Sequence, residues 1–367
     1  MKLKREVVWL AAALAAACNV AVASNVKVTP IGQRTGEFCA QDRALLFEDP
    51  TGVRVLYDPG NTVAGAADSR LGSVHVILIS HAHSDHLGNA KLNQDPNSST
   101  ASCSSALTTP APSSNTAEIA AAKQSAVIAG GPLATVIGRL IAAVAGLPTA
   151  ACPASGLTNE MTVPRSAPCT AGLGLGAKRT VRNTAASQGV QISAVAAEHP
   201  NELSSAFVAD PEKTNLSSNG LGAYVGLANG FVVTFTNGLR VYLSGDTGLT
   251  ADMGAVVHDY FAPDLAVINM GDIFTTGPEE AAFAVTDLIR PTSVIPSHVN
   301  EAATQGGMAV SGSRTARFLD LLSKGSNGHG SDDSRQGHGF VSVLLPLSGA
   351  TMEFDDSGRC QAGCQGR

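Results

Sequence analysis

Three histidines and an aspartate crowd into six positions directly after an apolar segment. Residues 74–80 read VHVILIS, which is typical of a buried strand, and the next six read HAHSDH. Side chains two positions apart in an extended chain point the same way, so His81 and His83 can bind one ion. Asp85 and His86 follow where the chain turns and can face a second ion. Burying imidazoles without an ion or polar partners is costly, so this segment predicts a metal site at a strand end.

Further ligands are needed for two ions, and three side chains at the ends of other predicted strands can supply them. His199 ends the segment VQISAVAAEH, Asp246 ends VYLSGD and His298 ends SVIPSH. Taken singly, each is more typical of an ordinary loop or capping residue. Their repetition at strand ends favours ligands that meet at one shared rim.

Charge and composition narrow the class of substrate. The chain has 30 acidic and 24 basic residues, a formal net charge of -6 and 4% aromatic residues. A general nucleic-acid binder needs a basic face for the phosphates. We therefore expect a small-molecule substrate and no nucleic acid. The 44% of hydrophobic residues is ample for a buried core.

The first residues have the parts of a secretory signal peptide. A basic start precedes an apolar run over 7–17, and Ala-Val-Ala at 21–23 is a small-residue cleavage pattern. The run is shorter than the roughly 20 apolar residues that span a membrane. We expect residues 1–23 to be removed, no stable membrane span afterwards, and a periplasmic or secreted protein. Lipidation of Cys18 stays open, because the residues before it are one position out of step with a lipoprotein box.

Cleavage at that site leaves an even number of cysteines, which favours disulfides in an exported protein. They are Cys39, Cys103, Cys152, Cys169, Cys360 and Cys364. The sequence does not choose the pairing, and the local pair Cys360 with Cys364 is one candidate. Free thiols or metal ligands are the alternative, although none of these cysteines has the C-x-x-C spacing of a zinc site.

Apolar patterns and turn signals predict a strand-rich chain with a few helices. The expected strands cover 44–49, 53–58, 74–80, 190–199, a hairpin over 231–246, 264–271, 293–298, 339–346 and 350–354. Helices are expected over 275–290 and 314–324, and the segments 117–130 and 132–146 read as helical or as helix followed by strand.

One domain over 24–355 is expected, followed by a polar tail over 356–367. Residues 89–190 begin with a stretch rich in Ser, Thr, Pro and Asn that lacks apolar periodicity. We interpret 89–190 as a segment that contains a low-complexity insertion or lid. The alternative is a surface decoration held by disulfides.

Taken as a set, these motifs resemble the metallo-β-lactamase fold superfamily, in particular the UlaG-like branch of ascorbate-6-phosphate lactonase and similar metal-dependent hydrolases. The resemblance runs from about Thr35 to Phe354 and is carried by LFEDPTGVRVLYDPG, SHAHSDH, AEHP, NGLRVYLSGDTG, PDLAVINMGDIFTTGPEEAA and VIPSHVN. It implies the α/β (α+β) class and a four-layer αβ/βα sandwich with metals at the shared edge of its two sheets. The export signal and the segment 89–190 depart from the cytosolic lactonase, so its substrate is not carried over.

The resemblance also implies a ligand set, residue by residue. It makes His81, His83 and His199 the ligands of metal one, Asp85, His86 and His298 those of metal two, and Asp246 the bridge. Nitrogen and carboxylate donors without cysteine fit Zn²⁺ best, with Mn²⁺ or Fe as alternatives. Two ions can hold a bridging water, lower its pKa and stabilise the oxyanion of an attacked centre. Asp85 is the expected catalytic residue that orients the resulting hydroxide.

Four residues in the motif loops are weaker candidates. Asp58 matches a position that supports the metal ligands from behind in this family, and a plain turn residue is the alternative reading. Thr247, Asp272 and Asn300 are candidates for the substrate pocket. The sequence therefore predicts an exported dinuclear hydrolase of a small ester, lactone or amide. The alternatives are a phosphodiesterase or phospholipase-like hydrolase and a non-catalytic metal-binding protein, and the oligomeric state is open.

Overall fold

The computed structural model describes residues 24–103, 108–111, 113–325 and 340–365. The predicted signal peptide over 1–23, with Cys18, lies outside the described residues. None of the helices within the described ranges is long and apolar enough to cross a membrane.

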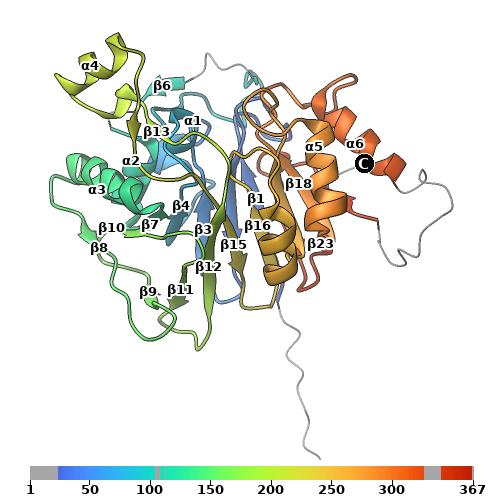
Figure 1. Cartoon of the computed structure of the whole chain (residues 1–367), viewed down its shortest axis with the longest axis horizontal. Helices are drawn as coiled ribbons and strands as arrows, with labels where there is room; N and C mark the ends of the chain where they lie inside the picture. Colours follow the sequence, from blue (N-terminus) through green and yellow to red (C-terminus); the bar gives the residue numbers. More distant parts are fainter. Residues whose placement is uncertain (1–23, 104–107, 112, 326–339, 366–367) are drawn as a thin grey trace, which may run out of the picture.

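Two large mixed sheets form the centre of the molecule (Figure 1). The first has nine strands in the order β23-β22-β1-β2-β3-β4-β7-β10-β8. Its strands are β1 (Val26–Ile31), β2 (Ala44–Glu48), β3 (Arg54–Tyr57), β4 (Val76–Leu78), β7 (Ala126–Ala129), β8 (Ala150–Ala151), β10 (Cys169–Gly172), β22 (Met352–Phe354) and β23 (Cys360–Ala362). The predicted polar tail therefore differs from expectation, because β23 pairs with β22 at the sheet edge.

The second sheet has eight strands in the order β21-β18-β17-β16-β15-β12-β11-β9. Its strands are β9 (Met161–Val163), β11 (Lys178–Asn183), β12 (Gly189–Ala196), β15 (Asn229–Thr234), β16 (Arg240–Leu243), β17 (Leu265–Asn269), β18 (Ser293–Ser297) and β21 (Ser342–Val343). The hairpin predicted around Asn237-Gly238 joins β15 to β16, with Gly238 at a φ of 105°. Glycine adopts this left-handed turn conformation without steric cost.

Short elements complete the structure. They are the strands β5 (Ala90–Leu92), β6 (Thr108–Pro110), β13 (Glu202–Leu203), β14 (Ala223–Tyr224), β19 (Thr304–Gln305) and β20 (Met308–Ala309). The α-helices are α1 (Ser84–Leu87), α2 (Asn115–Lys123), α3 (Gly131–Ala145), α4 (Glu212–Ser218), α5 (Pro278–Phe283) and α6 (Arg314–Gly325). The 3-10 helices are η1 (Gly65–Ala67) and η2 (Ser205–Phe207), and the π-helices are η3 (Met253–Phe261) and η4 (Ala284–Ile289).

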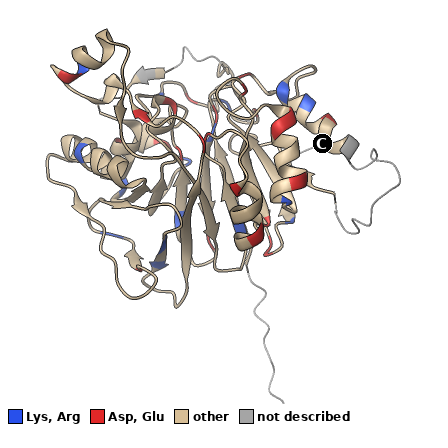
Figure 2. Ribbon diagram, viewed as in Figure 1, with Lys and Arg blue, Asp and Glu red and all other residues tan. Residues whose placement is uncertain are grey.

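Helices cover the outer face of each sheet, which makes four layers. In β2, Leu45 and Phe47 pack between the sheets while Leu46 packs against α2 and α3, because successive side chains of a strand point to opposite faces. On the other sheet, α5, η3 and η4 bury a third apolar cluster. Charged residues lie mainly on helices and loops, and the strands carry few (Figure 2). The predicted αβ/βα sandwich is confirmed.

Much of the segment over 89–190 belongs to the core of the fold, which corrects the predicted insertion or lid. Strand β7 lies between β4 and β10 in the first sheet and pairs in parallel with both. Helix α3 buries Leu133, Ile137 and Ile141 against that sheet. Helix α2 followed by β7 matches the helix-then-strand reading of 117–130, whereas the pairing of β7 inside the first sheet was not predicted.

All six cysteines of the described chain form disulfides. The pairs are Cys39 with Cys103, Cys152 with Cys169, and Cys360 with Cys364. The local pairing named as a candidate from the sequence is therefore present. The first pair joins the segment before β2 to residues 64 positions further along the chain.

Candidate metal centre

Strand directions bring the predicted ligands to one edge of the sandwich. Strands β12, β16 and β18 all run the same way, because β12 and β16 are each antiparallel to β15 and β16 to β18 are parallel. His199, Asp246 and His298 follow their carboxyl ends. On the facing sheet His81 and His83 follow β4, and the amide of Asn229 donates to the carbonyl of Ser80 at 2.9 Å, joining the sheets beside them.

The first ligand group consists of His81, His83 and His199, each offering a ring nitrogen within 4.8 Å of the others. The Nε2 atom of His199 lies 3.2 Å from Nδ1 of His83. The Nε2 atom of His81 is buried and has no hydrogen-bond partner among the described residues. A buried nitrogen without a partner is costly unless something absent from the protein atoms binds it.

The second ligand group consists of Asp85, His86 and His298, whose ligand atoms also lie within 4.8 Å of one another. Asp85 and His86 belong to α1, and Nε2 of His298 lies 3.3 Å from Oδ2 of Asp85. His298 has a φ of 50°, a left-handed backbone conformation that is uncommon for residues other than glycine and often found at functional sites.

Asp246 lies between the two groups. Its Oδ2 atom is 3.1 Å from Nε2 of His298 and 3.7 Å from Nε2 of His199. Its Oδ1 atom is 3.3 Å from Nε2 of His86. One carboxylate therefore reaches nitrogens of both groups, as the predicted bridging position requires.

Side chains behind the histidines orient their rings. Nδ1 of His86 lies 2.9 Å from Oδ2 of the buried Asp58, which also accepts hydrogen bonds from the amide and hydroxyl of Ser80. Nε2 of His83 lies 3.6 Å from the carboxylate of Glu202 on β13. Such partners fix the protonated ring nitrogen and leave the other free to bind a metal. The sequence predicted this position for Asp58, and Glu202 was missed.

Electrostatics in the first group favour the protonation states that bind metals. Burial lowers the pKa of His81 well below its usual value, with the nearby His86 adding to the shift, and burial also lowers the pKa of His199. Burial opposes ionisation of Asp246, but His86 and His298 hold its pKa well below the usual range. Neutral imidazoles and an ionised carboxylate are the forms that metal binding needs.

The second group attracts positive charge more strongly. Burial lowers the pKa of His86, but Asp246, Asp58 and Asp85 together raise it to about 10. Burial likewise opposes ionisation of Asp85, but the guanidinium of Arg43 together with His86 and His298 holds the pKa of Asp85 well below its usual range. The donors present fit a divalent ion at each group, and the second group also holds a protein cation.

That cation, Arg43, is a site residue that sequence reasoning missed. Its side chain is 2% exposed, and its Nη1 atom donates to Oδ2 of Asp85 and lies 3.0 Å from Nε2 of His86. The segment CAQDRALL carries no metal-site motif, and Arg43 lies 42 positions before Asp85 in the chain. No signal in the sequence marked it.

Comparison with known proteins identifies the family. The family model described as the Beta-lactamase superfamily domain matches residues 41–298, which include every proposed metal ligand. The chain belongs to this superfamily. The resemblance found in the sequence motifs is thereby confirmed.

Relatives and solved structures of the superfamily agree with the fold. The chain is 31% identical over 239 residues to a UPF0173 metal-dependent hydrolase of Cupriavidus necator, a match that covers 65% of this chain and 62% of that relative. It is 31% identical over 261 residues to one from Cupriavidus metallidurans, covering 70% and 69%. Igni18, a metallo hydrolase from Ignicoccus hospitalis, shares the fold at 19% identity and a TM-score of 0.50, covering 90% of this chain and 100% of that chain.

The three residues predicted for the substrate pocket, Thr247, Asp272 and Asn300, make contacts within the loops around the metal centre. Thr247 is buried and its hydroxyl accepts from the amide of Glu198 at 2.9 Å, so it holds the backbone beside His199. Asp272 is exposed and accepts from the amide of Ile273. Asn300 packs over Gly271, where a Cβ atom would lie 2.5 Å from its Nδ2. Asp272 and Asn300 therefore shape the loops around His298.

Apolar side chains stand at the rim of the centre. Ile273 is 81% exposed and Phe274 is 78% exposed, and the carbonyl of Phe274 lies 3.2 Å from Nδ1 of His199. Ile273 has a φ of 62°, which is strained for a β-branched residue. Tyr224 pairs directly with Glu202 in the β13–β14 hairpin, so both side chains lie on one face of it. Sequence reasoning did not single out these rim residues.

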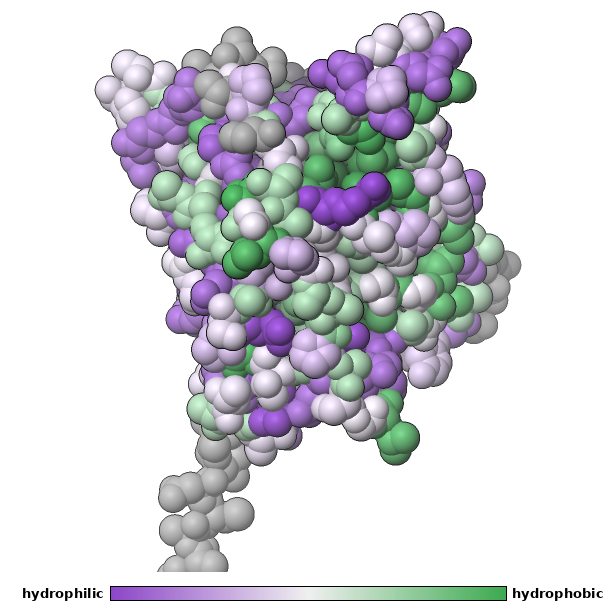
Figure 3. All heavy atoms as spheres, turned by 90° about the vertical axis from the view of Figure 1, so that its left-hand side faces the viewer, coloured by the Kyte–Doolittle hydropathy of each residue, from purple (hydrophilic) through white to green (hydrophobic). Residues whose placement is uncertain are grey.

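A separate hollow lies beside that hairpin. It is about 620 Å³ in volume and is lined by residues of α3, α4 and the hairpin, among them Val136, Leu203 and Leu216. Figure 3 shows it as an apolar recess beside α4. Leu203 and Tyr224 of the hairpin line the hollow, whereas Glu202 faces His83.

Proposed function

We propose that this protein is an exported hydrolase that uses two divalent metal ions, Zn²⁺ in the first instance, to cleave a small ester, lactone or amide. The observation that carries the proposal is the meeting of two ligand groups around Asp246. The names of the matched relatives, which are metal-dependent hydrolases, support it.

The ligating side chains suit this chemistry. Bound ions of this kind supply a water of lowered pKa and neutralise charge that develops on an attacked oxygen. Asp246 contacts both ligand groups, since Oδ2 faces His199 and His298 and Oδ1 faces His86. The side chain of Asp85 is 32% exposed, so it reaches both the ligands and solvent. We assign to its carboxylate the orientation of the attacking water and the transfer of a proton to the leaving group.

The rim of the centre supports a substrate with an apolar part. Ile273 and Phe274 expose large hydrophobic side chains next to His199, and Tyr224 lies on the face of the hairpin that carries Glu202. Exposed apolar side chains grouped beside polar ligands are characteristic of small-molecule sites. We infer that an apolar group of the substrate packs against Phe274 while its polar centre lies between the ligand groups.

Export of the protein rests on two observations. The sequence begins with a signal-peptide pattern, and the described chain holds three disulfides, which persist in oxidising compartments. Expression of the full chain in a Gram-negative host, followed by fractionation, is expected to yield processed protein outside the cytoplasm. Retention of the full-length chain in the cytoplasm would contradict export without affecting the proposed chemistry.

Metal analysis and hydrolysis assays test the proposed activity. Purified protein is assayed for zinc, manganese and iron, and then for hydrolysis of lactone, β-lactam and bis-phosphodiester probes with and without a chelator. His81→Ala is expected to abolish metal binding and turnover. The matched control His258→Ala removes a histidine of η3 that contacts the carbonyl of Ile289, and it should retain both. Bound metal with no turnover of any probe would favour a non-catalytic metal-binding protein, and turnover of the phosphodiester alone would favour a phosphodiesterase.

A further inference from the structure

Arg43 places a permanent positive charge inside the second ligand group. It precedes β2 and its side chain is 2% exposed. Its Nη1 atom contacts Oδ2 of Asp85 and lies 3.0 Å from Nε2 of His86. These two atoms are two of the three that would bind the second ion.

A guanidinium at this position competes with a metal ion for the same atoms. Arginine stays protonated in proteins and offers only N–H donors. A guanidinium 3.0 Å from Nε2 of His86 occupies the space that an ion bound to that nitrogen would need. The Asp85 oxygen that pairs with Arg43 is likewise the oxygen 3.3 Å from His298 in the second group.

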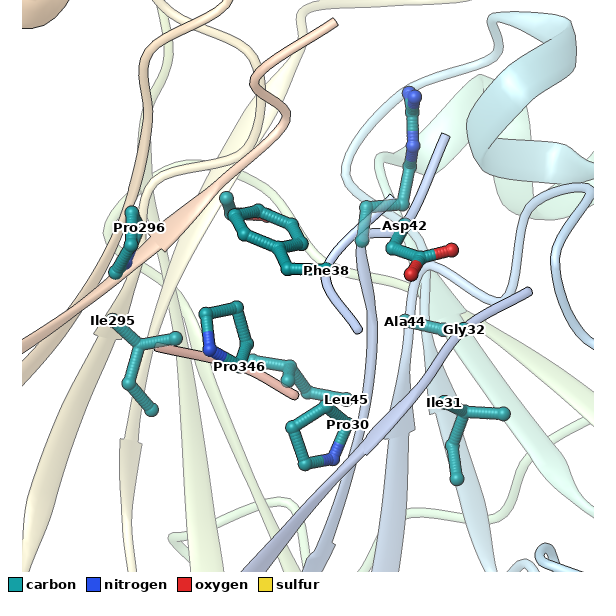
Figure 4. Close-up of a pocket in the computed structure, with 12 residues that line it drawn as sticks. Pro30, Ile31, Gly32, Phe38, Asp42, Ala44, Leu45, Ile295, Pro296 and Pro346 are labelled. Atoms are coloured by element: carbon teal, nitrogen blue, oxygen red, sulfur yellow. The ribbon is translucent and has the colours of Figure 1, made fainter. Parts of the chain in front are cut away.

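The surroundings of Arg43 hold its guanidinium in place. Nε donates to the carbonyl of Gln41 at 3.2 Å, and Nη2 is buried without a hydrogen-bond partner among the described residues. On the side away from the ligands, Arg43 borders a small pocket with Phe38, Leu45, Ile295 and Pro296 in its wall (Figure 4). That largely apolar pocket offers no favourable place for a displaced charge.

Nearby Asp42 does not draw Arg43 away from the ligands. Its two carboxylate oxygens accept hydrogen bonds from the amides of Gln33 and Cys39 at 2.9 Å. The ion pair of Arg43 is instead with Asp85.

The first ligand group has no such competitor. Within the described ranges, no hydrogen bond or ion pair joins a lysine or arginine to His81, His83 or His199. The ion pairs of these histidines are with the carboxylates of Asp246 and Glu202. Both carboxylates favour a bound cation.

From this contrast we propose that Arg43 makes the two ion sites unequal in their affinity for metal. One ion binds tightly to His81, His83, His199 and Asp246. The second binds weakly to Asp85, His86 and His298, because it must displace the Arg43 guanidinium from Asp85 and His86. Arg43 is thus a positioning residue that sets the metal content of the centre, an inference that rests on the proposed metal centre.

Titration of the metal-free full-length protein tests this proposal without any assay of activity. Zn²⁺ is titrated in competition with a chromophoric chelator, and Co²⁺ is titrated with its visible absorption bands as a readout of ligand geometry. Wild-type protein should bind one equivalent tightly and the second at least about tenfold more weakly. Arg43→Met should strengthen binding of the second equivalent by about 10–100-fold, the range in which residues behind metal ligands act, and leave the first within a few-fold.

A matched control removes a different arginine from the neighbouring strand. Arg54 at the start of β3 pairs with Glu48 and contacts no proposed ligand, so Arg54→Met should leave both equivalents unchanged. Arg43→Lys keeps the positive charge but lacks the planar guanidinium. Its affinity for the second equivalent of Zn²⁺ should lie between those of wild type and Arg43→Met. If Arg43→Met does not fold, the titrations of Arg43→Lys and of wild-type protein still test the proposed effect of Arg43 on the second affinity.

Two results distinguish this proposal from the proposed function. If wild-type protein binds two equivalents of Zn²⁺ with equally high affinity, the proposed role of Arg43 is overturned and the proposal of a two-metal hydrolase is unaffected. No tight equivalent at all would instead overturn the metal centre on which both depend. A second affinity that is the same in wild type, Arg43→Met and Arg43→Lys would also refute the inference.

Discussion

The two ligand groups use similar side chains in different surroundings. Among the described residues, His81, His83 and His199 form ion pairs with carboxylates alone, whereas Asp85 and His86 share their ligand atoms with Arg43. Both groups contain at least two imidazoles and both touch Asp246. The difference teaches that ligand identity alone does not set the metal content of such a centre. On the proposal made for Arg43, a charge in contact with the ligands sets the order in which ions bind.

The largest effect is expected from removal of His81. Its ring takes part in two of the ligand clusters, one with His83 and His199 and one with His86 and Asp246. His81→Ala should lower the metal content below one ion per chain and reduce kcat/KM by more than about 100-fold, since loss of a direct ligand exceeds the 10–100-fold cost of losing an outer partner. Elemental analysis and steady-state kinetics measure both.

His298→Ala removes a proposed ligand of the second group, as His81→Ala does in the first. It should remove the weak equivalent and keep the tight one, because His298 lies with Asp85 and His86. Loss of both equivalents on this substitution would break the comparison and show that the two groups bind metal as one unit.

Asp58→Asn is expected to have the next largest effect. Asp58 is completely buried and holds His86 at 2.9 Å, so the amide should misorient that ring and weaken the second ion by about 10–100-fold. The matched control is Asp49→Asn, which alters an equally buried carboxylate that binds Thr236 and Thr51 away from the centre. Competition titrations with Zn²⁺ compare the two variants, and equal second affinities in both would rule out the role of Asp58.

Glu202→Gln should act on the first group, and more weakly. The Glu202 side chain is 51% exposed and lies 3.6 Å from His83, so solvent screens the interaction. We expect the tight equivalent to weaken by roughly tenfold at most, with the second unchanged. The same Zn²⁺ titration measures it, and a loss as large as that of Asp58→Asn would show that exposure does not separate the two partners.

Phe274→Ala should leave both metal equivalents unchanged. Only the carbonyl of Phe274 contacts His199, and alanine retains that carbonyl. For an apolar substrate, KM should rise by roughly tenfold at most while kcat changes little, as for the loss of a contact made equally in ground and transition states. Kinetics on short and long acyl esters check this, and a loss of metal would place Phe274 in the ligand framework instead of the rim.

Several parts of the centre were predictable from local sequence. The pattern HAHSDH after an apolar strand, and single His or Asp residues after three other strands, marked all seven proposed ligands. Asp58 was recognisable because it matches a position that supports the metal ligands in the family that the sequence resembles. The contact made by Thr247 was not predictable, because a hydroxyl in a loop gives no indication of whether it faces solvent or the backbone of another loop.

Other parts depend on contacts between distant segments. The role of β7 in the first sheet was hidden because four apolar residues fit a strand or a helix equally well, and pairing with β4 and β10 decides the matter. Glu202 and Phe274 reach the centre only because the hairpin β13–β14 and the loop after β17 fold over it.

The sequence by itself determined the donor atoms and the superfamily, because strand ends and ligand types follow from local chain geometry. Only the tertiary structure decided that a guanidinium lies between Asp85 and His86, since that contact joins residues 42 or more positions apart and no local pattern encodes it. The physical reason is that electrostatic energy depends on distance in space, and a buried charge acts on whatever the fold places within a few ångströms of it.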